Sequence, residues 1–323
     1  MRMIMHQPAY AGRSPCATVR WHGTTMHPTE EHIMGSSGIL SIALVCGFMV
    51  LAAAPISAGD EAALKKAVTF YASFDKSLMP DVGVGPIRTR FGTPTEPAKF
   101  TFEPGFNKKI YHIAKGKGIA GGCLEATDVL PNRGRFYYPV KGNLAYKNGG
   151  WSGACSMWIN MDPAALKLGF CDPVQITQKG ANNGGIWFDF NDAKPRDLRM
   201  GVFPAVPEGT VGAKESDDDA PMVWVKKVLF KTGDWHHVVL SWSNFDTGKK
   251  DAVATLYIDG KKIGAVKDRA IAMDWDIEQA GIYTALGYTG LLDEMALFNR
   301  ALTADEVAAL HKTPGLLTGL KKK

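Results

Sequence analysis

Apolar and polar residues alternate along many short segments of this chain. In residues 153–161, Cys155, Met157 and Ile159 fall on one face, and polar or amphipathic residues fall on the other. Residues 235–242 and 290–298 are similarly short and rich in β-branched, aromatic and aliphatic side chains. A period of two over short segments predicts β-strands. Turn residues separate the strands throughout, so we expect one all-β domain over residues 59–313.

Two local signals define the end of this domain. Asp259-Gly260 separates two strand-like segments, and a two-residue Asp-Gly loop accepts the positive φ angles of a type I′ hairpin turn. Farther on, Thr303 and Glu306 have the spacing of a capping box, and an apolar stripe follows them. The sequence therefore predicts a tight hairpin and then one short C-terminal helix.

Proline and glycine are concentrated in residues 79–118, which we expect to form an irregular surface excursion with two short edge strands. Residues 314–323 end in three lysines and are expected to form a solvated basic tail. We expect residues 1–58 to form an N-terminal extension with a signal peptide.

The only long apolar run covers residues 39–54. It is shorter than the roughly 20 residues that cross a bilayer, and Ile56-Ser57-Ala58 resembles a signal-peptidase site. We expect cleavage near Gly59, no stable membrane span afterwards, and a secreted, periplasmic or cell-surface protein. Translation starting near Met34, or an uncleaved anchor, are the alternatives.

The cysteines and the net charge limit which disulfides, metal sites and partners we expect. After signal removal Cys123, Cys155 and Cys171 remain, which permits at most one internal disulfide. Cys155–Cys171 is preferred because these two are closest in sequence, and three buried thiols are the alternative. The spacing is not that of a zinc site. The net charge of +5 is mild and forms no basic stripe, so a nucleic-acid partner is not expected.

Four pieces of the sequence together resemble a known family, the laminin-G-like jelly rolls of the concanavalin A-like lectin/glucanase superfamily. In order, they are Phe74-Asp75, Cys155–Asn160, Trp235–Trp242 with Leu256–Gly260, and Gly290–Glu294 before Leu302–Glu306. The resemblance covers residues 66–312. It implies two antiparallel sheets packed face to face as a jelly-roll sandwich. Many members bind carbohydrate or protein surfaces outside the cell, whereas others hydrolyse polysaccharides, so the fold alone does not fix the function.

The resemblance also implies a possible structural calcium ion. Asp75 and Asp293 occupy positions that can lie close together near a sheet edge in this family, and Ca²⁺ is bound by carboxylate and carbonyl oxygens. Glu294 adjoins them but points the opposite way along its strand. The alternative is that Asp293 only accepts backbone N–H bonds at the end of the sheet.

A carbohydrate site is predicted on the strand around Trp187. The apolar residues Ile186, Phe188 and Phe190 share one face, which should be internal. Trp187 and Asp189 are then left on the outer face. A sugar ring could stack on Trp187 while Asp189 and Asn191 accept hydrogen bonds from its hydroxyl groups. Most of the other tryptophans should belong to the core.

No complete catalytic signature is found. Only residues 215–219, with Glu215, Asp217 and Asp219, approach the carboxylate pattern of the related glucanases, and a solvated acidic loop explains them better. His236 and His237 point to opposite faces of a strand, so packing and hydrogen bonding are their expected roles. We therefore expect a non-catalytic module that recognises a glycan or an extracellular glycoprotein. A glycoside hydrolase or polysaccharide lyase, and a structural or adhesive domain, are the alternatives.

Overall fold

A computed structural model describes residues 57–83, 88–93, 96–104, 108–129 and 135–320. The apolar run at 39–54, the cleavage site's Ile56 and the terminal lysines lie outside the described residues. Among those that are described, no helix is both long and apolar enough to cross a bilayer.

The first of two antiparallel sheets is built around the long strands β7, β12 and β16. Its strand order is β14 (Lys261–Arg269), β13 (Ala252–Ile258), β12 (His236–Phe245), β7 (Trp151–Asn160), β16 (Gly290–Phe298), β5 (Cys123–Ala126) and β4 (Tyr111–Ala114), with β1 (Val68–Ala72) paired to β16. Within this sheet the hairpin between β13 and β14 turns at Asp259 and Gly260. Their φ angles are +50° and +76°, which confirms the predicted turn.

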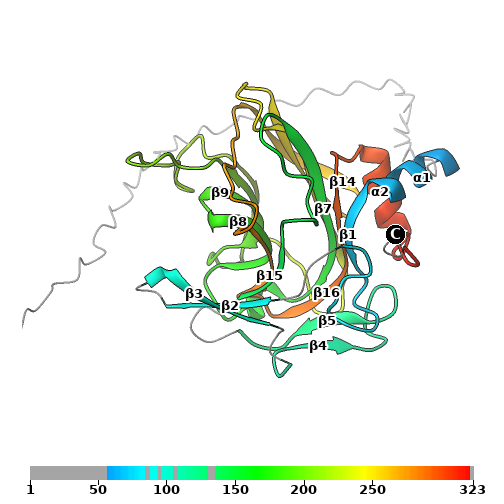
Figure 1. Cartoon of the computed structure of the whole chain (residues 1–323). Helices are drawn as coiled ribbons and strands as arrows, with labels where there is room; N and C mark the ends of the chain where they lie inside the picture. The colour runs from blue at the N-terminus through cyan, green and yellow to red at the C-terminus, as the bar shows by residue number, and fades with distance from the viewer. Residues whose placement is uncertain (1–56, 84–87, 94–95, 105–107, 130–134, 321–323) are drawn as a thin grey trace, which may run out of the picture. The chain divides into compact units, whose positions relative to one another are not determined.

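The second sheet is also antiparallel, and it packs against the first. Its strand order is β11 (Met222–Val225), β10 (Leu198–Phe203), β9 (Asn183–Phe190), β8 (Cys171–Gly180), β15 (Gly281–Leu286), β6 (Arg135–Pro139), β2 (Arg88–Thr93) and β3 (Glu96–Pro104). The segment 79–118 is more regular than predicted, because it contains the three strands β2, β3 and β4. Of these, β3 lies at the edge of this sheet and β4 at the edge of the first, whereas β2 lies between β6 and β3. The predicted two-layer sandwich is confirmed (Figure 1).

The main core lies between the two sheets and follows the alternation of the strands. Met157 and Ile159 on β7 face it from the first sheet, and Ile186 and Phe188 on β9 face it from the second. Each of these side chains is fully buried. The inner faces therefore use most of the large apolar residues, as the sequence predicts.

Two helices cover the outer face of the first sheet. The helix α1 (Ala58–Ala67) and the helix α2 (Ala304–Lys312) form a second cluster of buried residues with Val239 and Phe298. Figure 1 shows both helices beside β1 and β14, on the side away from β8 and β9. The predicted capping box is present, with Glu306 N–H donating to Thr303 Oγ1 at 3.2 Å. Leu317, expected to lie in a solvated tail, joins this cluster.

The three cysteines of the domain are buried and their thiols are free. Cys155 lies on β7 and Cys171 lies on β8, so the two belong to different sheets. The preferred Cys155–Cys171 disulfide is therefore wrong. Proximity in sequence was a poor guide because the second half of β7 and the connection to the opposite sheet separate the two thiols.

Because helices cover one outer face, the outer face of the second sheet and the loops at the ends of the sandwich remain for binding.

Candidate functional site

Trp187 lies on the outer face of the second sheet, as its alternation with Ile186 and Phe188 predicts. However, the residue is only 1% exposed. Phe203 stacks on the indole with ring centroids 5.8 Å apart, and the indole Nε1–H donates to Ala181 O at 2.9 Å. The expectation that Trp187 offers a ring to solvent is therefore wrong, because neighbouring side chains cover that ring.

Asp189 also lies on this face, where it forms a buried ion pair with Arg199. The two residues are cross-strand partners on β9 and β10. Arg199 Nε donates to Asp189 Oδ1 at 2.8 Å, and Nη2 binds the other carboxylate oxygen. Burial raises the pKa of Asp189, although the bonds from Arg199 oppose this shift. Both carboxylate oxygens of Asp189 are therefore occupied by Arg199. The residue orients this guanidinium and is not free to accept a hydrogen bond from a sugar hydroxyl.

The side-chain amide of Asn191 forms its hydrogen bonds within its own turn. Its Oδ1 accepts the backbone N–H of Asp197 at 2.8 Å and that of Ala193 at 3.2 Å, while its Nδ2 donates to Asp197 Oδ2 at 3.0 Å. Asn191 thus shapes the connection between β9 and β10. Its predicted role as a ligand-binding residue is not supported by this geometry.

Two exposed aromatic residues flank the guanidinium group of Arg199. Trp224 on β11 is directly opposite Arg199 in the sheet and is 37% exposed. Phe170, just before β8, is 52% exposed. Their ring centroids lie 5.0 Å and 5.2 Å from Arg199 Cζ, within the range of a cation–π contact. The aromatic surface on this face is therefore made by Trp224 and Phe170 instead of Trp187.

Sequence reasoning singled out neither aromatic residue, because it assigned most tryptophans other than Trp187 to the core. Trp224 stands in a short apolar segment, and Phe170 stands in a loop, so neither has an alternation pattern that assigns its face. Only the register between β10 and β11 places Trp224 beside Arg199. The signal that could have found the site was the alternation of Arg199 with Leu198 and Met200, which puts a cation on the same face as Asp189.

Glu215 and Asn182 complete the polar part of the site. Arg199 Nη1 donates to Glu215 Oε2 at 2.6 Å, and Asn182 Nδ2 donates to Glu215 Oε1 at 3.0 Å. The amide oxygen Oδ1 of Asn182 is buried and has no hydrogen-bond partner among the described residues. An unpaired buried acceptor is costly, so the hydrogen bond from Asn182 Nδ2 to Glu215 is formed at the expense of an unsatisfied amide oxygen.

The acidic segment 215–219 is a turn and not a strand. Glu215 binds Arg199, whereas Asp219 lies by Arg269, with Nη2 and Oδ2 3.4 Å apart. These two carboxylates have separate partners on separate strands, so they do not face each other across a groove.

The predicted calcium ligands Asp75 and Asp293 both contact the loop at residues 118–122. Asp75 Oδ1 accepts Gly122 N–H at 2.8 Å, and Asp293 Oδ2 accepts Ala120 N–H at 3.2 Å. Burial raises the pKa of Asp293 to about 8. One oxygen of each carboxylate therefore accepts a hydrogen bond from the backbone. For Asp293, this is the role that the alternative to a calcium ligand predicts.

The donor set around this loop is only partly suited to a metal ion. Glu294 is turned away and accepts the Tyr71 hydroxyl at 2.8 Å. No cluster of three or more His, Cys, Asp or Glu side chains in the described ranges is placed to hold a metal ion. A calcium ion here would need backbone carbonyl or water oxygens in addition to the two aspartates.

His236 and His237 point to opposite faces of β12, as predicted. His236 Nδ1 lies 2.9 Å from Asp259 Oδ2, and His237 Nε2 lies 2.8 Å from Ser156 Oγ. His237 stacks on Trp158 with ring centroids 5.0 Å apart. Burial lowers the pKa of His237 to about 3. Both rings therefore have packing and hydrogen-bonding roles.

Comparisons with known proteins agree with this architecture. A family model for the concanavalin A-like lectin/glucanases superfamily matches residues 142–308. No curated protein matches the chain.

Several solved structures are similar to this chain at low identity. One is domain 4 of AbnA, a GH43 extracellular arabinanase from Geobacillus stearothermophilus in complex with arabinotriose, with 18% identity, a TM-score of 0.45 and coverage of 76% of this chain and 98% of that one. Another is the Ruminococcus gnavus IT-sialidase CBM40 bound to α2,3-sialyllactose, with 13% identity, a TM-score of 0.40 and coverage of 58% and 96%. A third is the binding domain of Paraclostridial Mosquitocidal Protein 1, with 14% identity and a TM-score of 0.43; the match covers 77% of this chain and 52% of that one.

Proposed function

This chain belongs to the concanavalin A-like lectin/glucanase superfamily, and on that premise we propose that it is an exported, non-catalytic module that binds carbohydrate or glycoprotein surfaces. The proposal is carried by one observation. Two exposed aromatic rings, Trp224 and Phe170, flank the buried Arg199, which forms ion pairs with the buried Asp189 and the partly exposed Glu215.

This arrangement suits the two kinds of surface that a sugar presents. The C–H groups of a pyranose or furanose ring can pack on the rings of Trp224 and Phe170, because aromatic side chains supply large, rigid apolar area. Sugar hydroxyls can donate to the exposed part of Glu215, whose side chain is 29% accessible. Asp189 acts as a positioning residue by fixing the guanidinium of Arg199.

Glycan-array binding by the purified protein tests this proposal. We expect Trp224→Ala and Phe170→Ala each to weaken binding by about ten-fold or more, because truncation of an aromatic contact residue removes most of its packing area. The melting temperature should stay within a few degrees, since both side chains are exposed. Ile263→Ala, an exposed apolar residue on β14, is the matched control and should bind normally. Unchanged binding by both aromatic variants would contradict the proposed site.

A glycoside hydrolase remains the second candidate because this face holds two carboxylates, Asp189 and Glu215, on the same arginine. We favour binding because Arg199 holds Asp189 through both carboxylate oxygens, which leaves no free acid or nucleophile at that position. Release of reducing sugars from a polysaccharide panel, lost in Glu215→Gln, would establish hydrolysis instead. Self-association without glycan binding or hydrolysis would favour the structural or adhesive alternative.

We also propose that a calcium ion can bind at the loop 118–122, held by Asp75 and Asp293. The ion would neutralise a carboxylate that is costly to bury, and its role would be structural. Support comes from the contact of both aspartates with one loop.

Export is part of the same proposal. It predicts that the mature N-terminus lies near Gly59, which mass spectrometry of the protein recovered outside the cytoplasm can determine. Recovery of an intact N-terminus from the cytoplasm would contradict it.

A further inference from the structure

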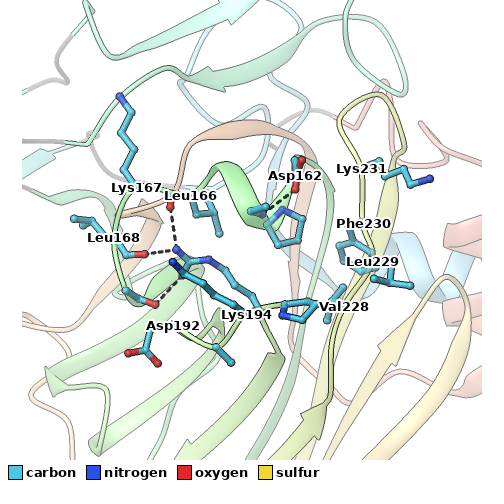
Figure 2. Close-up of a pocket in the computed structure, with 16 residues that line it drawn as sticks. Asp162, Leu166, Lys167, Leu168, Asp192, Lys194, Val228, Leu229, Phe230 and Lys231 are labelled. Atoms are coloured by element: carbon cyan, nitrogen blue, oxygen red, sulfur yellow. Dashed lines mark hydrogen bonds between the residues drawn. The ribbon is translucent and has the colours of Figure 1, made fainter.

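A second surface lies at one end of the sandwich, in a pocket that the glycan site does not use. The pocket has a volume of about 790 Å³ and is enclosed by residues 162–169, 192–196 and 228–231 (Figure 2). These segments connect β7 to β8, β9 to β10, and β11 to β12. Its size is in the range of ligand-binding pockets.

The wall of the pocket is held rigidly by Arg196. Its guanidinium donates to four backbone oxygens, those of Leu166 at 2.9 Å, Leu168 at 2.8 Å, Gly169 at 2.8 Å and Asn191 at 2.7 Å. In addition, Val228 N–H donates to Arg196 O at 2.8 Å. Arg196 thus ties the three loops together, which makes the pocket a built feature of the fold.

The lining of the pocket is apolar and continues onto the outer surface. Leu166 and Val228 are almost fully buried in it. At the rim, however, Leu168 is 44% exposed and Leu229 is 78% exposed. These two leucines lie in loops that line the same pocket, so together they extend its apolar lining to the surface, where burial against a partner would be favourable.

The same rim is positively charged. The lining contains four basic residues and two acidic ones, and Asp162, one of the acids, already accepts Ala164 N–H at 2.8 Å. Lys194 and Lys231 have no ion-pair partner within the described part of the chain. Among the described residues, Lys167 pairs with the exposed Asp128. Figure 2 shows Lys167 and Lys231 extending outward on opposite sides of the pocket.

Exposed leucine side chains that are surrounded by lysines are complementary to an anionic lipid surface. Burial of the leucine side chains at the boundary of the acyl chains is favourable, and the lysines are attracted to the negatively charged lipid phosphates. An acidic polysaccharide would satisfy the lysines but would leave Leu229 exposed. We propose that this pocket and its rim dock the protein on an anionic membrane surface, with Leu168 and Leu229 entering the interface.

Vesicle flotation with the purified protein tests this docking surface. We expect binding to vesicles of phosphatidylcholine mixed with phosphatidylglycerol, little binding to phosphatidylcholine alone, and loss of binding in high salt. Leu229→Ser should weaken partitioning by about ten-fold, because it removes one apolar side chain from the interface. The double variant Lys194→Gln with Lys231→Gln should weaken it by about twenty-five-fold, at roughly five-fold for each lysine.

Matched controls distinguish docking at this pocket from general charge effects. Lys249→Gln removes a lysine beyond the opposite end of β12, about 30 Å along that strand, and should not change binding. Trp224→Ala, which alters the glycan site, should also bind vesicles normally. Equal binding to both vesicle types, or rim variants that bind like the unaltered protein, would overturn the proposal. Retention on an acidic polysaccharide without vesicle binding would overturn it in favour of a glycan.

Discussion

Among individual residues, Arg199 has the greatest influence on the outer face of the second sheet. It is 2% exposed, forms ion pairs with Asp189 and Glu215, and contacts Phe170 and Trp224. A buried pair of charges contributes little net stability, but removal of one partner leaves the other charge uncompensated. Arg199 therefore maintains both the fold of this face and the positions of the exposed rings.

Replacement of Arg199 tests this dependence. Arg199→Met should lower the free energy of unfolding by about 3–5 kcal/mol, because Asp189 would stay buried without its partner. Asp189→Asn should cost less, since Arg199 keeps its ion pair with Glu215 in that variant. Urea unfolding of the two variants measures the difference. An Arg199→Met variant as stable as the unaltered protein would show that the ion pair has no such role.

His237 provides a pH-dependent prediction. Burial, together with the nearby His311, lowers its pKa to about 3 in the folded protein, whereas an unfolded histidine titrates near 6.5. The unfolded chain therefore binds one more proton between these two values. The stability that neutral His237 contributes is complete above about pH 6.5 and is lost as the pH falls toward 3, at about 1.4 kcal/mol per pH unit.

Thermal unfolding between pH 7 and pH 4 checks this effect. His237→Gln should show a shallower loss of stability with acid than the unaltered protein. His236→Gln, on the opposite face of the strand, should keep the steep loss. Parallel pH profiles for His237→Gln and the unaltered protein would contradict the assignment to His237.

Single residues also show how far sequence reasoning extends. The face on which Trp187 and Asp189 lie follows from strand alternation, and the structure confirms that face. Their solvent exposure does not follow from it, because Phe203 and Ala181 from other parts of the chain cover the indole. Alternation defines the direction of a side chain but not what lies above it.

At the level of secondary-structure elements, local signals were sufficient wherever the determining residues are close in sequence. The Asp259-Gly260 turn and the capping box at Thr303 are both complete within a few residues, and both form as predicted. The acidic loop at 215–219 and the loops at 162–169 and 226–231 contain no such signal. Their positions depend on Arg199 and Arg196, whose partners lie far away in sequence.

The calcium proposal concerns one such junction, where the loop 118–122 meets the ends of β1 and β16. Burial raises the pKa of Asp293 to about 8, so this carboxyl is mostly protonated at pH 6 when no cation is bound. The fold favours that proton, and the stability it contributes is complete below about pH 4 and is lost as the pH rises through 8. Calcium must displace the proton, so it should bind better at higher pH.

Melting temperatures with calcium and with chelator test this junction. Calcium should raise the melting temperature by a few degrees at pH 8 and by less at pH 6. Asp293→Asn should abolish the calcium response at both pH values. A melting temperature indifferent to chelator at pH 8 would end the calcium proposal.

In the whole molecule, the helices α1 and α2 occupy one outer face, which leaves two separate surfaces for partners. The first is the outer face of the second sheet, with Trp224 and Phe170. The second is the lysine-rimmed pocket at the end of the sandwich. A protein with both surfaces could bind a glycan while docked on a lipid surface, and each function can be removed by substitutions that leave the other intact.

The central claim is that sugar binds beside Trp224 without being transformed. A titration of the ¹⁵N-labelled protein with a glycan that the array identifies, followed by NMR, tests it most directly. The indole N–H signal of Trp224 should shift progressively, those of the buried Trp187 and Trp242 should not, and the spectrum of the glycan should remain that of the intact molecule. A stationary Trp224 signal with shifts elsewhere, or new reducing-end signals from the glycan, would contradict the account.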